Sequence, residues 1–163
     1  MFILRYVYML ALVVWLGGMI VLGAVVAPST FQVLQMLEPE SGRVLAGEVF
    51  GTSLARFSYV SYAAAGLMII TLTGMGVLGP RPRPFLLRGI IIAAMLGIAL
   101  YAGVIVANQI AVVQQEAGGQ PSLLPASDPR RVRFDALHRL SERLMLVNVI
   151  GALALLFWEA KKE

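Results

Sequence analysis

Side chains able to take part in chemistry gather just before the last apolar segment of the sequence. The only histidine of the chain, His138, lies in "FDALHRLSERLMLVNV" (134–149), with Arg139, Glu142 and Arg143 beside it. A histidine titrates near neutral pH, so it can move a proton, bind a metal ion or hydrogen-bond to a carboxylate. The uncharged stretch "IGALALLFW" follows at once. His138 is therefore either a site residue or a polar group near the end of a helix bundle that extends out of the lipid.

The polar residues of this segment recur at helical spacing. Phe134, His138, Ser141, Met145 and Asn148 are separated by three or four positions, which places them on one helix face. In a membrane helix a polar face turns inward, away from lipid. Polar residues of the other segments that we expect near this face are Glu48, Arg56 and Asn108. We predict an internal polar cluster in which His138 hydrogen-bonds to a side chain of another helix; a proton, ion or ligand site is the alternative.

The residue types give little support to a metal or catalytic centre. The chain has no cysteine and one histidine, so a metal ion would need carboxylates, thioethers or a second copy of the chain to complete its ligands. The methionines, which could bind copper as soft ligands, are scattered without a closely spaced pair. The apolar runs 6–27, 57–79, 89–113 and 144–158 contain no acid, so paired carboxylates cannot form there. We predict no catalytic residue, no metal ligand and no cofactor; a membrane oxidoreductase is the alternative.

The composition is that of an integral membrane protein. Of 163 residues, 59% are hydrophobic and 13% are charged, and the mean hydropathy is +0.82. A soluble domain has about 25% charged residues. The net charge of +4 does not indicate nucleic-acid binding, because no basic run has interleaved aromatic residues. Basic side chains at the lipid surface explain it better, so the lipid bilayer is the expected partner.

Four apolar segments are close to the length of about 20 residues that crosses a bilayer. They predict one all-α transmembrane domain over residues 1–163, an antiparallel four-helix bundle. The expected spans are residues 6–27, 57–79, 89–113 and 140–158, with one flexible Gly/Pro/Ser-rich connection at 116–129. The apolar core of the first segment is longer than that of a cleaved signal peptide, so we expect the chain to retain it.

The helices are predicted to extend beyond the hydrocarbon on the non-cytoplasmic side. Before the last span, Ser127 or Asp128 can cap the first free amides and Pro129 suits the first helical position. The fourth helix should therefore begin near 129, several turns before the lipid. A break is expected at "EPES" (38–41), after a kink at Pro28.

The basic residues orient the chain. The tight loop between the second and third spans holds three arginines and no acid: Arg81, Arg83 and Arg88. Lys161 and Lys162 follow the last span. The positive-inside rule then places this loop and both termini in the cytoplasm, in the cell (inner) membrane. The other two connections also carry arginines, but in long mixed-charge segments, which the rule weights less.

Small residues recur at every fourth position on the third span. The two series are Gly89, Ala93 and Gly97, then Ala99, Gly103, Ala107 and Ala111. Such residues let membrane helices approach closely. We expect them to pack inside the bundle, with Gly97 and Gly103 in tight interfaces; a homo-oligomer formed through the same face is the alternative.

Two sequence stretches together resemble a known family. "WLGGMIVLGAVVAPSTFQVL" carries a Trp-x-Gly-Gly pattern followed by Ala-Pro-x-x-Phe, and "RFDALHRLSERLMLVN" carries Phe-x-x-x-His-x-x-Ser. Both are similar to the transmembrane-protein-205-like family, four-span membrane proteins that carry a domain of unknown function, and more distantly to copper-resistance protein D. The matching positions are Trp15, Gly17, Gly18, Pro28, Phe31, Phe134, His138 and Ser141. The resemblance implies a fold and a membrane location, and no reaction.

The expected function is non-enzymatic. An inward polar face without a catalytic set favours a module that binds or transports a small solute, whose identity the sequence does not give, or that scaffolds a partner. The alternative is a copper- or haem-binding membrane module related to copper-resistance protein D.

Overall fold

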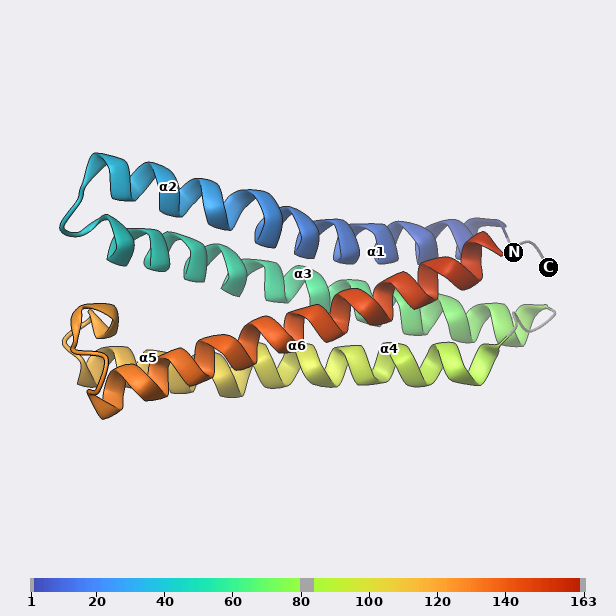
Figure 1. Ribbon diagram of the computed structural model, residues 1–163. Helices are drawn as coiled ribbons and strands as arrows, with labels where there is room; N and C mark the ends of the chain where they lie inside the picture. Colours follow the sequence, from blue (N-terminus) through green and yellow to red (C-terminus); the bar gives the residue numbers. More distant parts are fainter. Residues whose placement is uncertain (1, 80–83, 162–163) are drawn as a thin grey trace.

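The computed structural model describes residues 2–79 and 84–161. In this part of the chain the only regular structure is helical, and turns lie between the long helices (Figure 1). The predicted all-helical class is confirmed for these residues. Of the basic residues used to orient the chain, Arg81, Arg83 and Lys162 lie outside them.

Four helices of the described chain are long and apolar enough to cross a membrane. The first consists of α1 (Phe2–Val21), the π-helix η1 (Leu22–Val26) and α2 (Ala27–Leu37), and the second is α3 (Gly42–Leu78). The third consists of α4 (Phe85–Leu100), the π-helix η2 (Tyr101–Val106) and α5 (Ala107–Glu116). A short 3₁₀ turn, η3 (Pro121–Leu123), leads to the fourth, α6 (Pro129–Ala160). Each is longer than the roughly 20 residues that a hydrocarbon core requires.

The helices lie side by side (Figure 1). The first helix packs on α3, α4 packs on α3 and α6, α5 packs on α6, and α6 closes the arrangement against α1. The start of α1, the end of α3, the start of α4 and the end of α6 gather at one end, here called the terminal end. The turns from α2 to α3 and from α5 to α6 gather at the opposite end, here called the far end.

A π-helical turn lies immediately before Pro28, where the sequence predicts a kink. The amide of Ala27 donates to the carbonyl of Leu22, five residues back, instead of four. Proline has no amide hydrogen to continue the regular ladder, and the wider turn falls immediately before it. The third helix contains a second π-helical turn, η2. At its end the amide of Ala107 donates to the carbonyl of Ala102, again five residues back. This second irregularity has no signal in the sequence, because no proline or charged residue lies there.

The helix ends at the far end follow from local chemistry. α2 ends at Leu37, two residues before Pro39, and α3 begins at Gly42. Asp128 is the cap of α6: its carboxylate accepts a hydrogen bond of 2.9 Å from the Arg130 amide. The Arg130 side chain also donates to this carboxylate and holds the pKa of Asp128 below its usual value. Of the two residues that could cap this helix, Asp128 does so, and Pro129 takes the first helical position.

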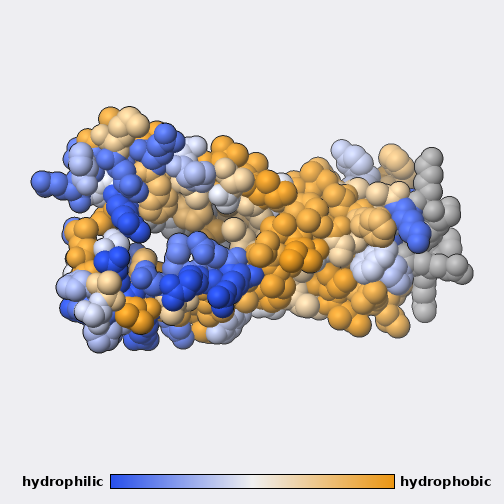
Figure 2. Space-filling view, viewed as in Figure 1, coloured by the Kyte–Doolittle hydropathy of each residue, from blue (hydrophilic) through white to orange (hydrophobic). Residues whose placement is uncertain are grey.

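The buried core occupies the half of the molecule nearer the terminal end. Its fully buried large side chains come from all four helices: Tyr8, Leu12, Trp15, Met68, Ile92 and Leu155. The outward faces of the same helices carry exposed valine, leucine and isoleucine side chains, as Figure 2 shows in the orange band. This is the distribution expected where lipid covers the helices, since lipid tails are as apolar as leucine.

The two small-residue series of the third helix lie on different faces. Gly97 and Ala93 are exposed, and a methyl group on Gly97 would meet no atom within 4 Å. A methyl group on Gly103 would overlap the Tyr62 hydroxyl and lie 3.2 Å from the Ser58 hydroxyl oxygen. The step from Gly97 to Ala99 is two residues, a rotation of about 200° around a helix. The prediction that Gly97 lies in a tight interface is therefore wrong within this chain, and Gly103 alone of the pair makes the close approach.

Leucine substitutions test whether Gly103 and Gly97 differ in packing. Gly103→Leu should lower the free energy of unfolding by about 1–3 kcal/mol, because it overpacks the contact with α3. Gly97→Leu should cause no loss, since its side chain enters open space on the lipid side. Thermal unfolding in a mild detergent measures both. A loss of equal size for the two variants would mean that Gly97 also has a packing partner, such as a second copy of the chain.

Candidate functional site

A cavity of about 270 Å³ lies between the four helices, on the far-end side of the core. Its wall is mostly apolar. From the first helix and α3 come Trp15, Met19, Leu22, Leu54, Phe57, Ser58 and Ser61. From the third helix and α6 come Ala99, Ala102, Gly103, Gln114, Ser141, Met145 and Asn148. A concave, largely apolar space with a few polar groups is the usual form of a small-molecule site.

The cavity lies where the helices separate into two arms. α2 packs on α3 and α5 packs on α6, whereas within the described chain the two pairs make few contacts with one another. We call these pairs the α2–α3 arm and the α5–α6 arm. Figure 2 shows a hollow between the arms, bordered by hydrophilic residues. The space is therefore reached from the far end, through a polar mouth into an apolar interior.

Both π-helical turns contribute to the cavity wall. Leu22 belongs to η1, and Ala102 and Gly103 belong to η2. A π-turn widens a helix and is found frequently at functional sites. Two such turns, in helices distant in sequence, face the same space here. Their position supports the cavity as the candidate site.

The polar side chains of the wall include both hydrogen-bond donors and acceptors. The Ser58 hydroxyl donates to the carbonyl of Leu54 at 3.0 Å, and the Ser61 hydroxyl donates to the carbonyl of Phe57 at 3.2 Å. The Asn148 side chain is buried, and its Oδ1 has no hydrogen-bond partner among the described residues. The side chains that the cavity presents to a ligand are uncharged throughout its described wall.

The structure divides the polar residues selected from the sequence. Ser141 and Asn148 line the cavity, whereas Glu48, Arg56 and Asn108 are exposed and lie outside its wall. Helix geometry explains the difference. Arg56 precedes Ser58 by two residues, which turns its side chain about 200° away from the cavity. Asn108 follows the lining residue Ala107 directly and points about 100° away from it.

His138 lies outside the bundle interior, contrary to the prediction. Its side chain is 52% exposed, and its Nε2 lies 3.3 Å from the Glu142 carboxylate on the same helix. Its ring stacks on Phe134, with ring centres 6.2 Å apart. The two arms have already separated at this level, so the nearest carboxylate is the one a helical turn along α6. The predicted hydrogen bond to another helix is therefore replaced by a pair within α6.

Some residues of the two family-like sequence motifs lie at the cavity, and others do not. Trp15 is fully buried in its wall, and a methyl group on Gly18 would overlap the Phe57 ring. Gly17 has open space beside it. Phe31 and Phe134 are half-buried, and Pro28 is exposed.

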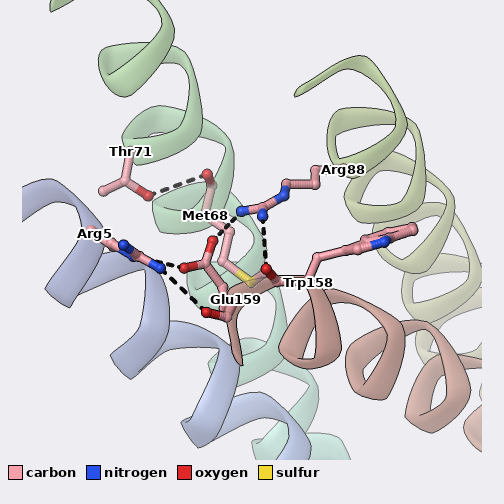
Figure 3. A network of polar contacts seen from close by, with 6 residues as sticks. All are labelled: Arg5, Met68, Thr71, Arg88, Trp158 and Glu159. Carbon is pink, nitrogen blue, oxygen red and sulfur yellow. Dashed lines mark hydrogen bonds and ion pairs between the residues drawn. The ribbon is translucent and has the colours of Figure 1, made fainter. Parts of the chain in front are cut away.

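A second polar cluster closes the terminal end, and sequence reasoning missed it. The Glu159 carboxylate on α6 forms ion pairs with Arg88 on α4 and, at 2.9 Å, with Arg5 on α1 (Figure 3). Arg88 also donates to the Trp158 carbonyl at 3.3 Å. The Arg88 and Glu159 side chains are each only 3% exposed. We call Arg5, Arg88 and Glu159 the terminal ion cluster.

The sequence held a signal for this cluster. The loop pattern predicts that Arg88 is a surface arginine like Arg81 and Arg83. Glu159 lies one residue beyond the last predicted span. A single acid at the end of one predicted span, level with two arginines at the ends of others, indicates a paired charge. Because the cluster joins α1, α4 and α6, it holds these helices together at the terminal end. No corresponding set of ion pairs joins the two arms at the far end of the described chain. Among the described residues, no group of three or more His, Asp or Glu side chains is placed to hold a metal ion.

Comparison with known proteins gives a family without an assigned activity. The family described as a domain of unknown function (DUF4149) matches residues 10–118. This range includes three of the four cavity walls, and α6, with Ser141 and Asn148, follows it. No curated protein and no solved structure matches the chain.

Proposed function

The chain belongs to the DUF4149 family, a domain of unknown function, and we propose that this four-helix membrane protein is a non-enzymatic module that binds a small, largely apolar molecule. The binding site is the cavity between the α2–α3 arm and the α5–α6 arm. The cavity itself carries the proposal: about 270 Å³ of mostly apolar space at the convergence of all four helices.

The volume of the cavity limits the size of the ligand. An engineered cavity of about 150 Å³ holds benzene, so by the same scale this one can hold a molecule of about ten non-hydrogen atoms. The terminal ion cluster supports entry from the far end, because it fastens the opposite end of α1, α4 and α6. Movement of the ligand between the far-end water and the lipid layer would then need only separation of the two arms.

The resemblance to the transmembrane-protein-205-like family remains part of the proposal. It is supported by Trp15 at the cavity wall and by Gly18, which lets the Phe57 ring pass close to α1. Both residues belong to the Trp-x-Gly-Gly pattern, so the pattern would serve to shape this wall.

Ligand binding can be followed through Trp15. In a Trp158→Phe background Trp15 is the only tryptophan, and it is 1% exposed, so molecules dissolved in the surrounding lipid do not reach it. A bromine atom quenches tryptophan fluorescence on contact. We expect para-bromophenol, added to the protein in lipid nanodiscs, to quench Trp15 saturably.

A matched pair of glycines controls this measurement. Gly51 lines the cavity and has open space beside it, so Gly51→Leu should fill the cavity without a clash and abolish the quenching. Gly47 also has open space on α3 but lies outside the cavity wall, so Gly47→Leu should bind as the parent protein does. Equal quenching in the parent, Gly51→Leu and Gly47→Leu proteins would overturn the proposed function.

The proposed orientation places the far end outside the cytoplasm and both termini inside it. Ser122→Cys, in the connection between α5 and α6, should react with a membrane-impermeant maleimide in intact cells. Arg83→Cys should react only after the cells are permeabilised. The reverse pattern would invert the topology and place the cavity mouth on the cytoplasmic side.

A further inference from the structure

The wall of the cavity holds a tryptophan whose hydrogen-bond donor has no acceptor. The Trp15 side chain is 1% exposed, and its indole Nε1 donates to no group in the part of the chain that the structure describes. This nitrogen is accessible from the cavity that Trp15 lines. An indole carries one N–H donor and no acceptor. Only a hydrogen-bond acceptor placed in the cavity can therefore satisfy it.

Asn148 supplies a second donor from α6. Its side chain is 5% exposed, and its Oδ1 has less than 1 Å² of accessible area, so this oxygen is out of reach of the cavity. The amide Nδ2 is the polar atom that the side chain leaves accessible there, and it donates to no described group. A buried polar group without a partner is costly and rare in folded proteins. Two helices thus present unmet donors to one space.

The other polar side chains of the wall do not supply the missing acceptors. The Ser58 and Ser61 hydroxyls donate to carbonyls of their own helix, and neither accepts from the two free donors. Gln114 and Ser141 lie nearer the far end, close to the end of α5 and toward the start of α6. The acceptor is therefore missing in the inner part of the cavity.

The charges of the wall narrow the ligand further. The described lining residues include no arginine or lysine to pair with an anion and no acid to pair with a cation. A charged ligand would enter this space without a partner, which costs much more than burying an unpaired neutral group. The ligand that fits this wall is then neutral.

We propose that the ligand is a neutral carbonyl-bearing hydrophobe, such as an apolar ketone, which accepts hydrogen bonds from Trp15 Nε1 and Asn148 Nδ2. A carbonyl oxygen has two lone pairs and brings no donor that would itself need a partner. The apolar body of the ligand then lies against the apolar lining side chains, which include Phe57 and Met145. This inference rests on the proposed function and adds the ligand class to it.

Two probes of equal shape test whether the cavity selects an acceptor. para-Bromoacetophenone and para-bromo-α-methylstyrene differ only in a C=O against a C=CH₂ group, and both match the size of about ten non-hydrogen atoms. Quenching of Trp15 is titrated with each in the Trp158→Phe background, and lipid partitioning is corrected with protein-free nanodiscs. We expect the ketone to bind roughly two- to tenfold more tightly for each hydrogen bond that it accepts.

A third probe tests the argument from charge. para-Bromobenzoate has the same size and two acceptor oxygens, but it is ionised at neutral pH. Because the described wall offers no cation, this probe should not quench Trp15 saturably. Tighter binding of the benzoate than of the ketone would overturn the assignment of a neutral ligand.

The carbonyl stretch of the bound ketone assigns the selection to its residues. A carbonyl that accepts a hydrogen bond absorbs at lower frequency than the same carbonyl in an alkane. Infrared difference spectra of isotope-labelled ketone, with the Gly51→Leu protein as the reference, should show this lower frequency. Trp15→Phe and Asn148→Leu should each reverse part of the shift. Ser61→Ala removes a lining hydroxyl but neither donor, so it should leave the shift unchanged.

Asn148→Leu also keeps the test independent of folding. It removes a buried amide without a partner and retains the side-chain shape, so it should unfold at an equal or higher temperature than the parent. We expect this variant to lose part of its preference for the ketone while para-bromo-α-methylstyrene still binds.

The outcomes separate this inference from the proposed function. If ketone and alkene quench equally and Gly51→Leu blocks both, the cavity binds small molecules without selecting an acceptor, and the carbonyl proposal alone is overturned. Full preference and an unchanged carbonyl frequency in both Asn148→Leu and Trp15→Phe would overturn it as well. If Gly51→Leu blocks neither probe, the cavity is not the site and both proposals are overturned.

Discussion

Replacing Glu159 by glutamine should lower the free energy of unfolding by about 3–5 kcal/mol, the cost of breaking a buried ion pair by removing one partner. The substitution leaves the Arg88 guanidinium, with a side chain 3% exposed, without its carboxylate. A neutral amide cannot compensate a buried positive charge, and the Arg88 Nε already has no hydrogen-bond partner within the described chain. Unfolding in mixed detergent micelles, followed by circular dichroism, measures the loss.

Two further variants show whether the burial of the pair causes this effect. Arg5→Gln removes the other ion pair of the terminal ion cluster, but the Arg5 side chain is 61% exposed, so the cost should be about 0–1 kcal/mol. Arg88→Met combined with Glu159→Leu replaces the buried pair by apolar groups of similar size. That double variant should recover most of the stability lost in Glu159→Gln. A Glu159→Gln protein as stable as the parent would show that Arg88 is not buried as a charge.

Gly42→Ala should be the most damaging single-methyl change in the α2–α3 arm, with a loss of about 3 kcal/mol from overpacking. A methyl group on Gly42 would overlap the Leu34 carbonyl and lie 2.8 Å from the Gln35 Cα. The Leu34 carbonyl is held in place because it accepts the amide of Glu38 at 2.9 Å. Backbone atoms cannot rotate aside as a side chain can, so the ends of α2 and α3 must separate. Thermal unfolding in detergent would record the loss.

Gly47→Ala is the matched control for this substitution. It lies one and a half turns further along α3, and a methyl group there meets no atom within 4 Å. Alanine is favoured over glycine in a helix interior, so this variant should gain about 0.5–1 kcal/mol. If Gly42→Ala and Gly47→Ala were equally stable, the close contact between the ends of α2 and α3 would be wrong.

The sequence by itself was enough for the helical class and for four helices long and apolar enough to span a membrane. Both depend on properties of single segments: the length of an apolar run and the scarcity of charge within it. Local chemistry also defined some helix ends. Asp128 and Pro129 act within one turn of α6, so no knowledge of the other helices was needed to expect a helix start there.

Other features depended on how the helices are rotated and where they separate, which only the tertiary structure decided. His138 and Asn148 share a helix face in the sequence, yet Asn148 is buried and His138 is exposed, because the arms part between them. Gly97 and Gly103 carry the same small side chain, and rotation about the third helix sends one to the outside and the other against Tyr62.

The terminal ion cluster and the cavity have the same physical origin. Arg5, Arg88 and Glu159 lie on three helices, and their pairing depends on how far each helix extends at the terminal end. The cavity is a volume between surfaces, which no single segment encodes. Apolar periodicity determines that a helix has a buried face, because water and lipid act on each segment separately. Which side chains meet across that face depends on the rotation, offset and separation of helices that are packed together, and this is decided only when they pack.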